Sequence, residues 1–167
     1  MGDRHMLGKE MLLKKFEYNH WANLRILDCA AKVSADQWDA PDDYSRGSLH
    51  DVIFHILRVE EGWLYMCQHH ERGTNLPNID QFPTADSLRP YADQQLATQK
   101  TFVENASEDD LAQSFTARNA AGEEYSLVIW QILTHVLYHS AQHRSEAAAL
   151  LTRYGQSPGD LDFIYFV

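Results

Sequence analysis

The sequence contains few cysteines and few positive charges, and it has no long apolar run. Its two cysteines, Cys29 and Cys67, are too few for a disulfide framework and lack CxxC spacing, so we expect two buried helix residues in a reducing compartment. A formal net charge of -10 leaves no basic face for nucleic-acid phosphates. No segment approaches the roughly 20 apolar residues of a transmembrane helix, and no signal peptide is visible. These absences predict a cytoplasmic protein that binds neither nucleic acid nor membrane.

The length of 167 residues is enough for one domain with a full hydrophobic core. Residues 1–10 have the composition of a vector remnant with a disordered start, so His5 is excluded from the search for a site. We therefore expect residues 11–167 to form a single domain.

Helical periodicity recurs four times along the chain. Apolar residues at spacings of three and four predict the helices, which cover residues 10–33, 48–70, 87–105 and 127–154. Ser48 is a suitable N-cap for the second helix, Pro90 is tolerable in the first turn of the third, and Gly155 is a suitable stop for the last. Four long helices joined by loops predict an all-α fold, an antiparallel four-helix bundle.

Shorter elements are expected between and after these helices. Segments 113–116 and 123–126 flank a turn-like stretch and predict a short β-hairpin before the last helix. Residues 107–111 read as a capped single turn, and residues 72–84 as a long loop. The apolar end at residues 163–167 is expected to pack on the helices or on a partner.

Three histidines recur at a spacing of four, at His135, His139 and His143. Side chains at i and i+4 of a helix share a face, and two imidazoles so placed can share one metal ion. Projection at about 100° per residue puts His143 in the middle of the apolar stripe, His139 about 40° away and His135 about 100° away. His139 and His143 are therefore the inward pair, whose alternative role is hydrogen bonding to tyrosines or glutamates in the core.

A third ligand should come from another helix, and both His55 and His20 are candidates by position. His55 lies at the edge of a single apolar face, whereas His20 lies on a helix that is apolar on two sides. Glu60 projects about 140° from His55 and is not expected to be a ligand. A carboxylate-bridged di-iron bundle is excluded, because it needs two Glu-x-x-His elements and the chain has only one, at residues 17–20. The remaining histidines are expected to be solvated at helix ends; they are His50, His69 and His70.

With these motifs the chain resembles the DinB family of DinB/YfiT-like metalloenzymes over residues 11–162. Residues 18–23 are similar to the start of the family's first helix. Residues 48–56 look like the second-helix motif that contributes one histidine ligand, and residues 135–144 look like the last-helix motif that contributes two. Their order and spacing together make the resemblance specific.

The resemblance implies His55, His139 and His143 as ligands of one divalent metal, with zinc and nickel both found in the family. It also implies a commonly dimeric antiparallel four-helix bundle. After the last ligand the family often continues Gly-Gln, whereas this chain has Ser145 and Glu146, a change expected to alter the surroundings of the site.

Family members include thiol S-transferases that use low-molecular-weight thiols, and others resemble hydrolases or isomerases. Three neutral histidines leave at least one metal position open, which is a catalytic arrangement. We therefore expect a metal-dependent enzyme of the thiol S-transferase or hydrolase type; the alternative is a noncatalytic metal-binding or stress-response dimer. Ligand histidines must be neutral, so the ordinary histidine pKa predicts loss of metal below about pH 6.5.

Overall fold

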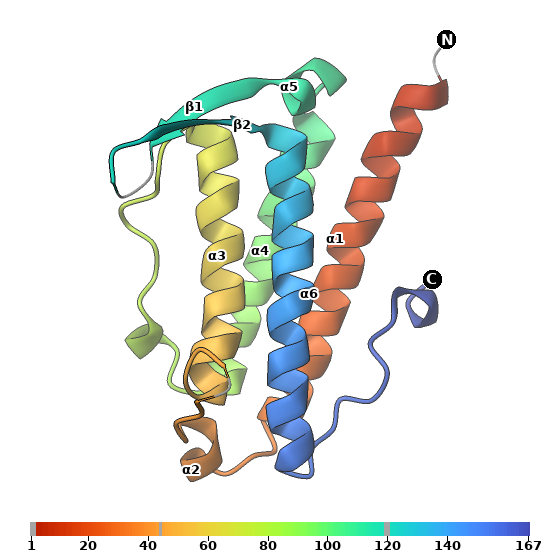
Figure 1. Ribbon diagram of the computed structural model, residues 1–167. Coiled ribbons are helices and arrows are strands. Elements are labelled where there is room, and N and C mark those ends of the chain that lie inside the picture. Colours follow the sequence, from red (N-terminus) through yellow and green to blue (C-terminus); the bar gives the residue numbers. More distant parts are fainter. Residues whose placement is uncertain (1–2, 44, 119–120) are drawn as a thin grey trace.

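The computed structural model describes residues 3–43, 45–118 and 121–167. Over these ranges the fold is mostly helical, with a small two-stranded sheet, as the sequence predicted. Four long helices lie side by side, and the sheet covers one end of them (Figure 1). The elements are α1 (Asp3–Ala30), α2 (Ala35–Trp38), α3 (Leu49–His69), α4 (Ala85–Asn105), α5 (Glu108–Ala112), β1 (Ser114–Arg118), β2 (Glu124–Val128) and α6 (Ile129–Arg153), with 3-10 turns at Ile79–Gln81 and Phe163–Tyr165.

Polar side chains fix where several helices begin. At α3 the Ser48 hydroxyl accepts a hydrogen bond from the Asp51 amide, and the Asp51 carboxylate accepts one from the Ser48 amide. This capping box satisfies two backbone donors that the first turn leaves unpaired. Thr84 caps α4 in the same way. The helix begins at Ala85, two residues earlier than predicted, so Pro90 lies inside that helix and not in its first turn.

Two hydrophobic clusters between the long helices show the direction in which each helix runs. One cluster joins the end of α1 and the end of α6 to the starts of α3 and α4. The other joins the starts of α1 and α6 to the ends of α3 and α4. Hence α1 and α6 run one way, and α3 and α4 run the other (Figure 1).

The parallel direction of the consecutive helices α3 and α4 departs from the predicted antiparallel arrangement. The closest packing does join antiparallel helices, α3 with α6 and α1 with α4. However, the loop after α3 returns to the end at which that helix began. An extended segment as long as residues 70–84 can span about 50 Å, whereas α3, with 21 residues, is only about 30 Å long. The loop is long enough to run back along the helices, so α4 can start beside the start of α3.

The hairpin and the chain end cover two parts of the helical surface. In the predicted hairpin, β1 pairs with β2 from Ser114 opposite Val128 to Arg118 opposite Glu124, while residues 119–120 of the turn lie outside the described ranges. The apolar chain end packs on α1 through Phe163, whose ring centroid is 5.2 Å from that of Tyr18. In the described residues, no helix has the length and apolarity needed to cross a membrane.

Both cysteines are free thiols in helices, as predicted. Cys67 is buried, but Cys29 is only half-buried, which corrects the expectation that both are core residues. The difference arises because Cys29 lies at the edge of the first hydrophobic cluster, where α1 ends.

Candidate metal centre

His55 of α3 and His139 and His143 of α6 form one group. One nitrogen of each ring lies within 4.8 Å of the corresponding atoms of the other two. The Nε2 atoms of His55 and His139 are 3.2 Å apart. Two nitrogens that bind the same tetrahedral zinc ion at about 2.0–2.1 Å lie about 3.4 Å from each other. The spacing and the chemistry of this donor set therefore fit a divalent metal ion.

A carboxylate holds the His143 ring in place. The Glu146 Oε2 atom lies 2.8 Å from His143 Nδ1, and an ionised carboxylate only accepts, so Nδ1 carries the proton. The Nε2 atom of His143 then carries a free lone pair, and a histidine binds a metal ion through such an unprotonated nitrogen. The same oxygen of Glu146 accepts a hydrogen bond of 2.7 Å from the Ser45 hydroxyl. The Ser145-Glu146 pair therefore does alter the surroundings of a predicted ligand.

The pKa of Glu146 is consistent with a charged carboxylate. Burial raises this pKa, but hydrogen bonds from Ser45 and His143 outweigh the burial and hold it below its ordinary value. A negative charge one turn along α6 stabilises the proton on His143 Nδ1 and makes the ring a better electron donor through its other nitrogen.

His55 and His139 are neutral well below neutral pH. Burial, followed by the charge of Arg46, lowers the pKa of His55 to about 4. Burial, followed by the charge of His143, lowers the pKa of His139 to about 4. These two rings therefore stay neutral, and available to a metal ion, below pH 6.5. Among the described residues, the buried Nδ1 atom of His139 has no hydrogen-bond partner.

His135 and His20 lie outside the group. His135 is exposed, and its ring packs edge-on against Trp63 at a centroid distance of 5.3 Å, so the predicted flank position is confirmed. The His20 ring faces Asp93 on α4, with Nε2 3.1 Å from the carboxylate. The helical projection left His20 and His55 as candidates and the resemblance implied His55; the structure groups His55, and not His20, with His139 and His143.

The prediction that all histidines at helix ends are solvated was wrong for His50. This side chain is buried, stacks on Trp38 at 4.7 Å between ring centroids, and bonds through Nδ1 to Asp39 at 3.1 Å. The short helix α2 packs over the start of α3, and its Trp38 ring covers the His50 side chain. His69 and His70, at the other end of α3, are exposed as predicted.

A buried polar network beside the histidines was not predicted from the sequence. Glu60 is only 2% exposed, and its Oε1 atom accepts hydrogen bonds from Asn19 at 2.7 Å, Asn23 at 3.1 Å and Ser140 at 2.7 Å. Its Oε2 atom accepts one from Gln99 at 3.1 Å. The four helices α1, α3, α4 and α6 thus meet at a single carboxylate. The sequence did contain a sign that Glu60 is buried. It follows the apolar residues Val52 and Ile56 at the same spacing of four, so it lies on the same face of the helix.

Arg144 completes this network on α6. It is 3% exposed and donates hydrogen bonds to the amide oxygens of Asn19 and Asn23, the same two residues whose amide nitrogens donate to Glu60. Burial lowers the pKa of Arg144, and the charge of Glu60 opposes that effect. Ser140 and Arg144 directly follow His139 and His143, the two candidate ligands on α6, so the network fixes the rotation of the helix face that carries them.

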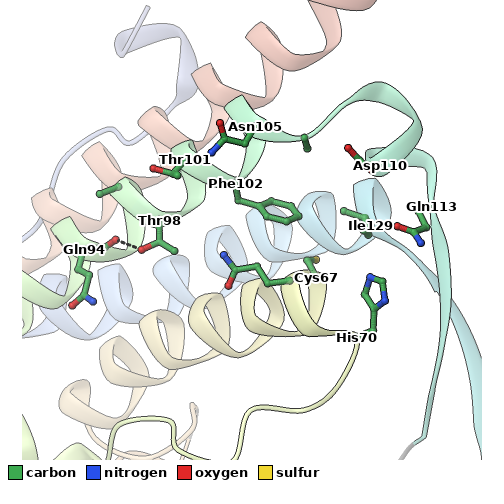
Figure 2. Close-up of a pocket in the computed structure, with 13 residues that line it drawn as sticks. Cys67, His70, Gln94, Thr98, Thr101, Phe102, Asn105, Asp110, Gln113 and Ile129 are labelled. Carbon is green, nitrogen blue, oxygen red and sulfur yellow. Dashed lines mark hydrogen bonds between the residues drawn. The ribbon is translucent and has the colours of Figure 1, made fainter.

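A cavity of about 690 Å³ lies apart from the histidine group, between the later parts of α3 and α4. Its lining includes Cys67 from α3, His70 directly after that helix, and Thr98, Thr101 and Phe102 from α4 (Figure 2). Burial raises the pKa of Cys67 to about 12, so this thiol is not a nucleophile at neutral pH. The three histidines of the candidate metal centre do not line this cavity.

Comparisons with known proteins confirm the resemblance seen in the sequence. The model of the DinB family matches residues 6–167. The crystal structure of the DinB-like protein YjoA from Bacillus subtilis has a TM-score of 0.62 and 12% sequence identity, and the alignment covers 88% of this chain and 94% of that one. At this identity the likeness shows a common fold and nothing about the reaction. No curated protein matches the sequence.

Proposed function

This chain belongs to the DinB family, and we propose that it is a metal-dependent enzyme that holds one divalent ion on His55, His139 and His143. The observation that carries the proposal is the meeting of three imidazole nitrogens within 4.8 Å. Zinc and nickel are the proposed ions, since both suit imidazole ligands. We interpret the four long helices as a four-helix bundle and residues 11–167 as one domain.

The proposed reaction type is a thiol S-transfer or a hydrolysis. Three neutral ligands leave at least one coordination position open for a reactant. A divalent ion held there would supply Lewis acidity, which lowers the pKa of a thiol or a water molecule in that position. The protein's own part is to orient the ligands. Glu146 fixes the His143 ring, and the network around Glu60 fixes the helix that carries His139 and His143.

We also propose a homodimer. The outer face of α6 exposes Trp130 by 50% and Tyr138 by 73%, two helical turns apart. Large apolar side chains that gather on one surface favour an interface between proteins. The alternative is a noncatalytic metal-binding dimer. The second experiment below distinguishes it from an enzyme by measuring turnover.

The first experiment measures bound metal in protein purified without a histidine tag. Elemental analysis after incubation with zinc or nickel and gel filtration should give close to one ion per chain. The His55→Ala, His139→Ala and His143→Ala variants should lose it. His135→Ala removes the exposed neighbour in the same repeat and is the matched control, which should keep it. Wild-type protein without a bound ion, or equal metal content in His139→Ala, would overturn the proposal.

The second experiment tests catalysis on the metal-loaded protein. Low-molecular-weight thiols are offered with electrophilic acceptors, and a parallel panel offers hydrolysable esters and amides. Turnover that disappears in His139→Ala and persists in His135→Ala would support an enzyme. Full metal occupancy without turnover in either panel would favour the noncatalytic alternative.

A further inference from the structure

A smaller cavity, of about 300 Å³, lies between α3 and the loop that follows this helix. That loop runs back along the helix (Figure 1). Two guanidinium groups line the cavity, Arg58 from α3 and Arg72 from the loop, and its apolar lining includes the indole ring of Trp63. No acidic side chain is among the described residues that line it. The cavity is therefore locally positive on a chain whose net charge is -10.

The cavity lies along the face of α3 that carries His55. Val59 and Trp63, which both line it, follow His55 at successive spacings of four, so the three side chains share a helix face. The Trp63 ring packs edge-on against His135, whose ring centroid is 5.7 Å from that of His139. The three histidines of the candidate metal centre do not line the cavity, so it is a separate site beside them.

Close packing holds the loop against α3. A Cβ atom at Gly62 would lie 3.2 Å from Leu76 Cδ1, and one at Gly73 would lie 3.3 Å from Leu76 Cδ2. Both distances are shorter than an ordinary contact of about 3.5–4.0 Å between carbon atoms. The Nε atom of Arg58 also donates a hydrogen bond of 3.2 Å to the Pro77 carbonyl. The two walls of the cavity are therefore fixed relative to each other.

Both guanidinium groups keep free hydrogen-bond donors. The bond to the loop uses only Nε of Arg58, which leaves its terminal nitrogens free to form the fork that matches an oxyanion. Within residues 3–43, 45–118 and 121–167, neither Arg58 nor Arg72 forms an ion pair, and the Arg72 side chain forms no hydrogen bond. The carboxylate of Glu61, an acidic neighbour of the cavity in the sequence, instead accepts a hydrogen bond from the Tyr91 hydroxyl of α4.

We propose that this cavity binds a small aromatic oxyanion, a carboxylate or a phosphate, whose charged end pairs with Arg58 and Arg72 while its ring packs on Trp63. A guanidinium fork forms parallel hydrogen bonds to either oxyanion. The indole ring offers a large flat apolar surface for the rest of the molecule. Ligand pockets begin at about 300 Å³, so this cavity has room for one ring with a short charged arm. The site does not depend on the proposed metal chemistry, because none of its groups is a proposed metal ligand.

NMR spectroscopy on the full chain after incubation with zinc tests the site. Proton–nitrogen correlation spectra should give one indole signal for each of the four tryptophans, and Trp63→Phe identifies the signal of Trp63. Phenylacetate and phenyl phosphate are titrated in parallel with 2-phenylethanol, which has the same ring without the charge. Wild type should bind one of the anions roughly tenfold more tightly than the alcohol, the range of a charge-assisted bidentate contact. The anion that binds more tightly identifies the oxyanion.

The two arginines are then replaced one at a time. Arg58→Gln and Arg72→Gln should each lose most of the preference for the anion and keep the affinity of wild type for the alcohol. Arg118→Gln is the matched control, because Arg118 is an exposed arginine that binds Glu124 away from the cavity. This control should keep the preference. His139→Ala should keep it too, because the anion is not bound by the metal ion.

Three results would overturn the proposal. The first is equal affinity of wild type for the anions and the alcohol, and the second is an unchanged preference in both arginine variants. The third is a preference that disappears in His139→Ala, since the anion would then be a ligand of the metal. Shifts of equal size in all four indole signals would also contradict the proposal, because the anion would then have no single site.

Discussion

Glu146 and His143 lie one turn apart on α6 and share a hydrogen bond of 2.8 Å between Oε2 and Nδ1. This contact decides which nitrogen of the ring is free, so it determines how His143 can act as a ligand. The Glu146 carboxylate also accepts a hydrogen bond from the Ser45 hydroxyl. The segment before α3 is therefore connected to the His143 ring through Glu146.

Removing the charge of Glu146 should weaken metal binding. Glu146→Gln keeps an oxygen that can accept a hydrogen bond from His143 Nδ1 but removes the negative charge behind the ring, so we expect roughly a tenfold loss of zinc affinity. Competition with a chromophoric chelator at neutral pH measures it. Glu10→Gln changes an exposed glutamate near the start of α1 and controls for net charge. An affinity equal to that of wild type would mean that the hydrogen bond does not tune the ligand.

The metal-free protein should lose stability as the pH falls from about 6.5 to about 4. His55 and His139 have a pKa of about 4 in the folded protein and an ordinary value of 6.5 when unfolded. Between these values the unfolded chain binds more protons, so acid favours unfolding. Urea titrations at a series of pH values measure the free energy of unfolding. The double variant His55→Gln, His139→Gln should show a flatter dependence in this window, with His69→Gln as the control for replacing a histidine. If the free energy of unfolding of wild type and of the double variant changed with pH in the same way, His55 and His139 would not be the source of the pH dependence.

Neutralising Glu60 should destabilise the fold. In Glu60→Gln the guanidinium of Arg144 stays buried without the charge of Glu60, which reaches it across the amides of Asn19 and Asn23. Leaving a buried charge uncompensated costs about 3–5 kcal/mol. Chemical denaturation measures the loss, and Glu71→Gln, at an exposed site, should change it little. Adding Arg144→Met to Glu60→Gln should recover part of the stability, because both charges are then gone. Additive losses would indicate that the two residues act independently.

Zinc should raise the thermal midpoint of unfolding only where the histidine group is complete. An ion that binds the folded state alone stabilises it by about 2.7 kcal/mol at a free concentration one hundred times the Kd. Calorimetry with and without zinc should show this increase in wild type and in His135→Ala, and no increase in His143→Ala. A similar increase in all three would place the ion elsewhere on the protein.

The sequence determined what depends on local periodicity. The spacing of apolar residues located the long helices, and Ser48 located the start of α3, because helix formation and capping involve residues three or four positions apart. The same period put His139 and His143 on one inward face and His135 on the flank. These relationships hold within a single helix, so they need no knowledge of its neighbours.

Only the tertiary structure decided what depends on how separate helices meet. The helical projection left His55 and His20 as alternatives, and only the family resemblance pointed to His55. The structure brings His55 of α3 to the pair on α6, while His20 lies against Asp93. The partners of Glu60 come from three other helices, and the parallel course of α3 and α4 depends on a loop long enough to allow either direction. Contacts between residues far apart in the chain depend on packing of the whole core, which no local pattern records.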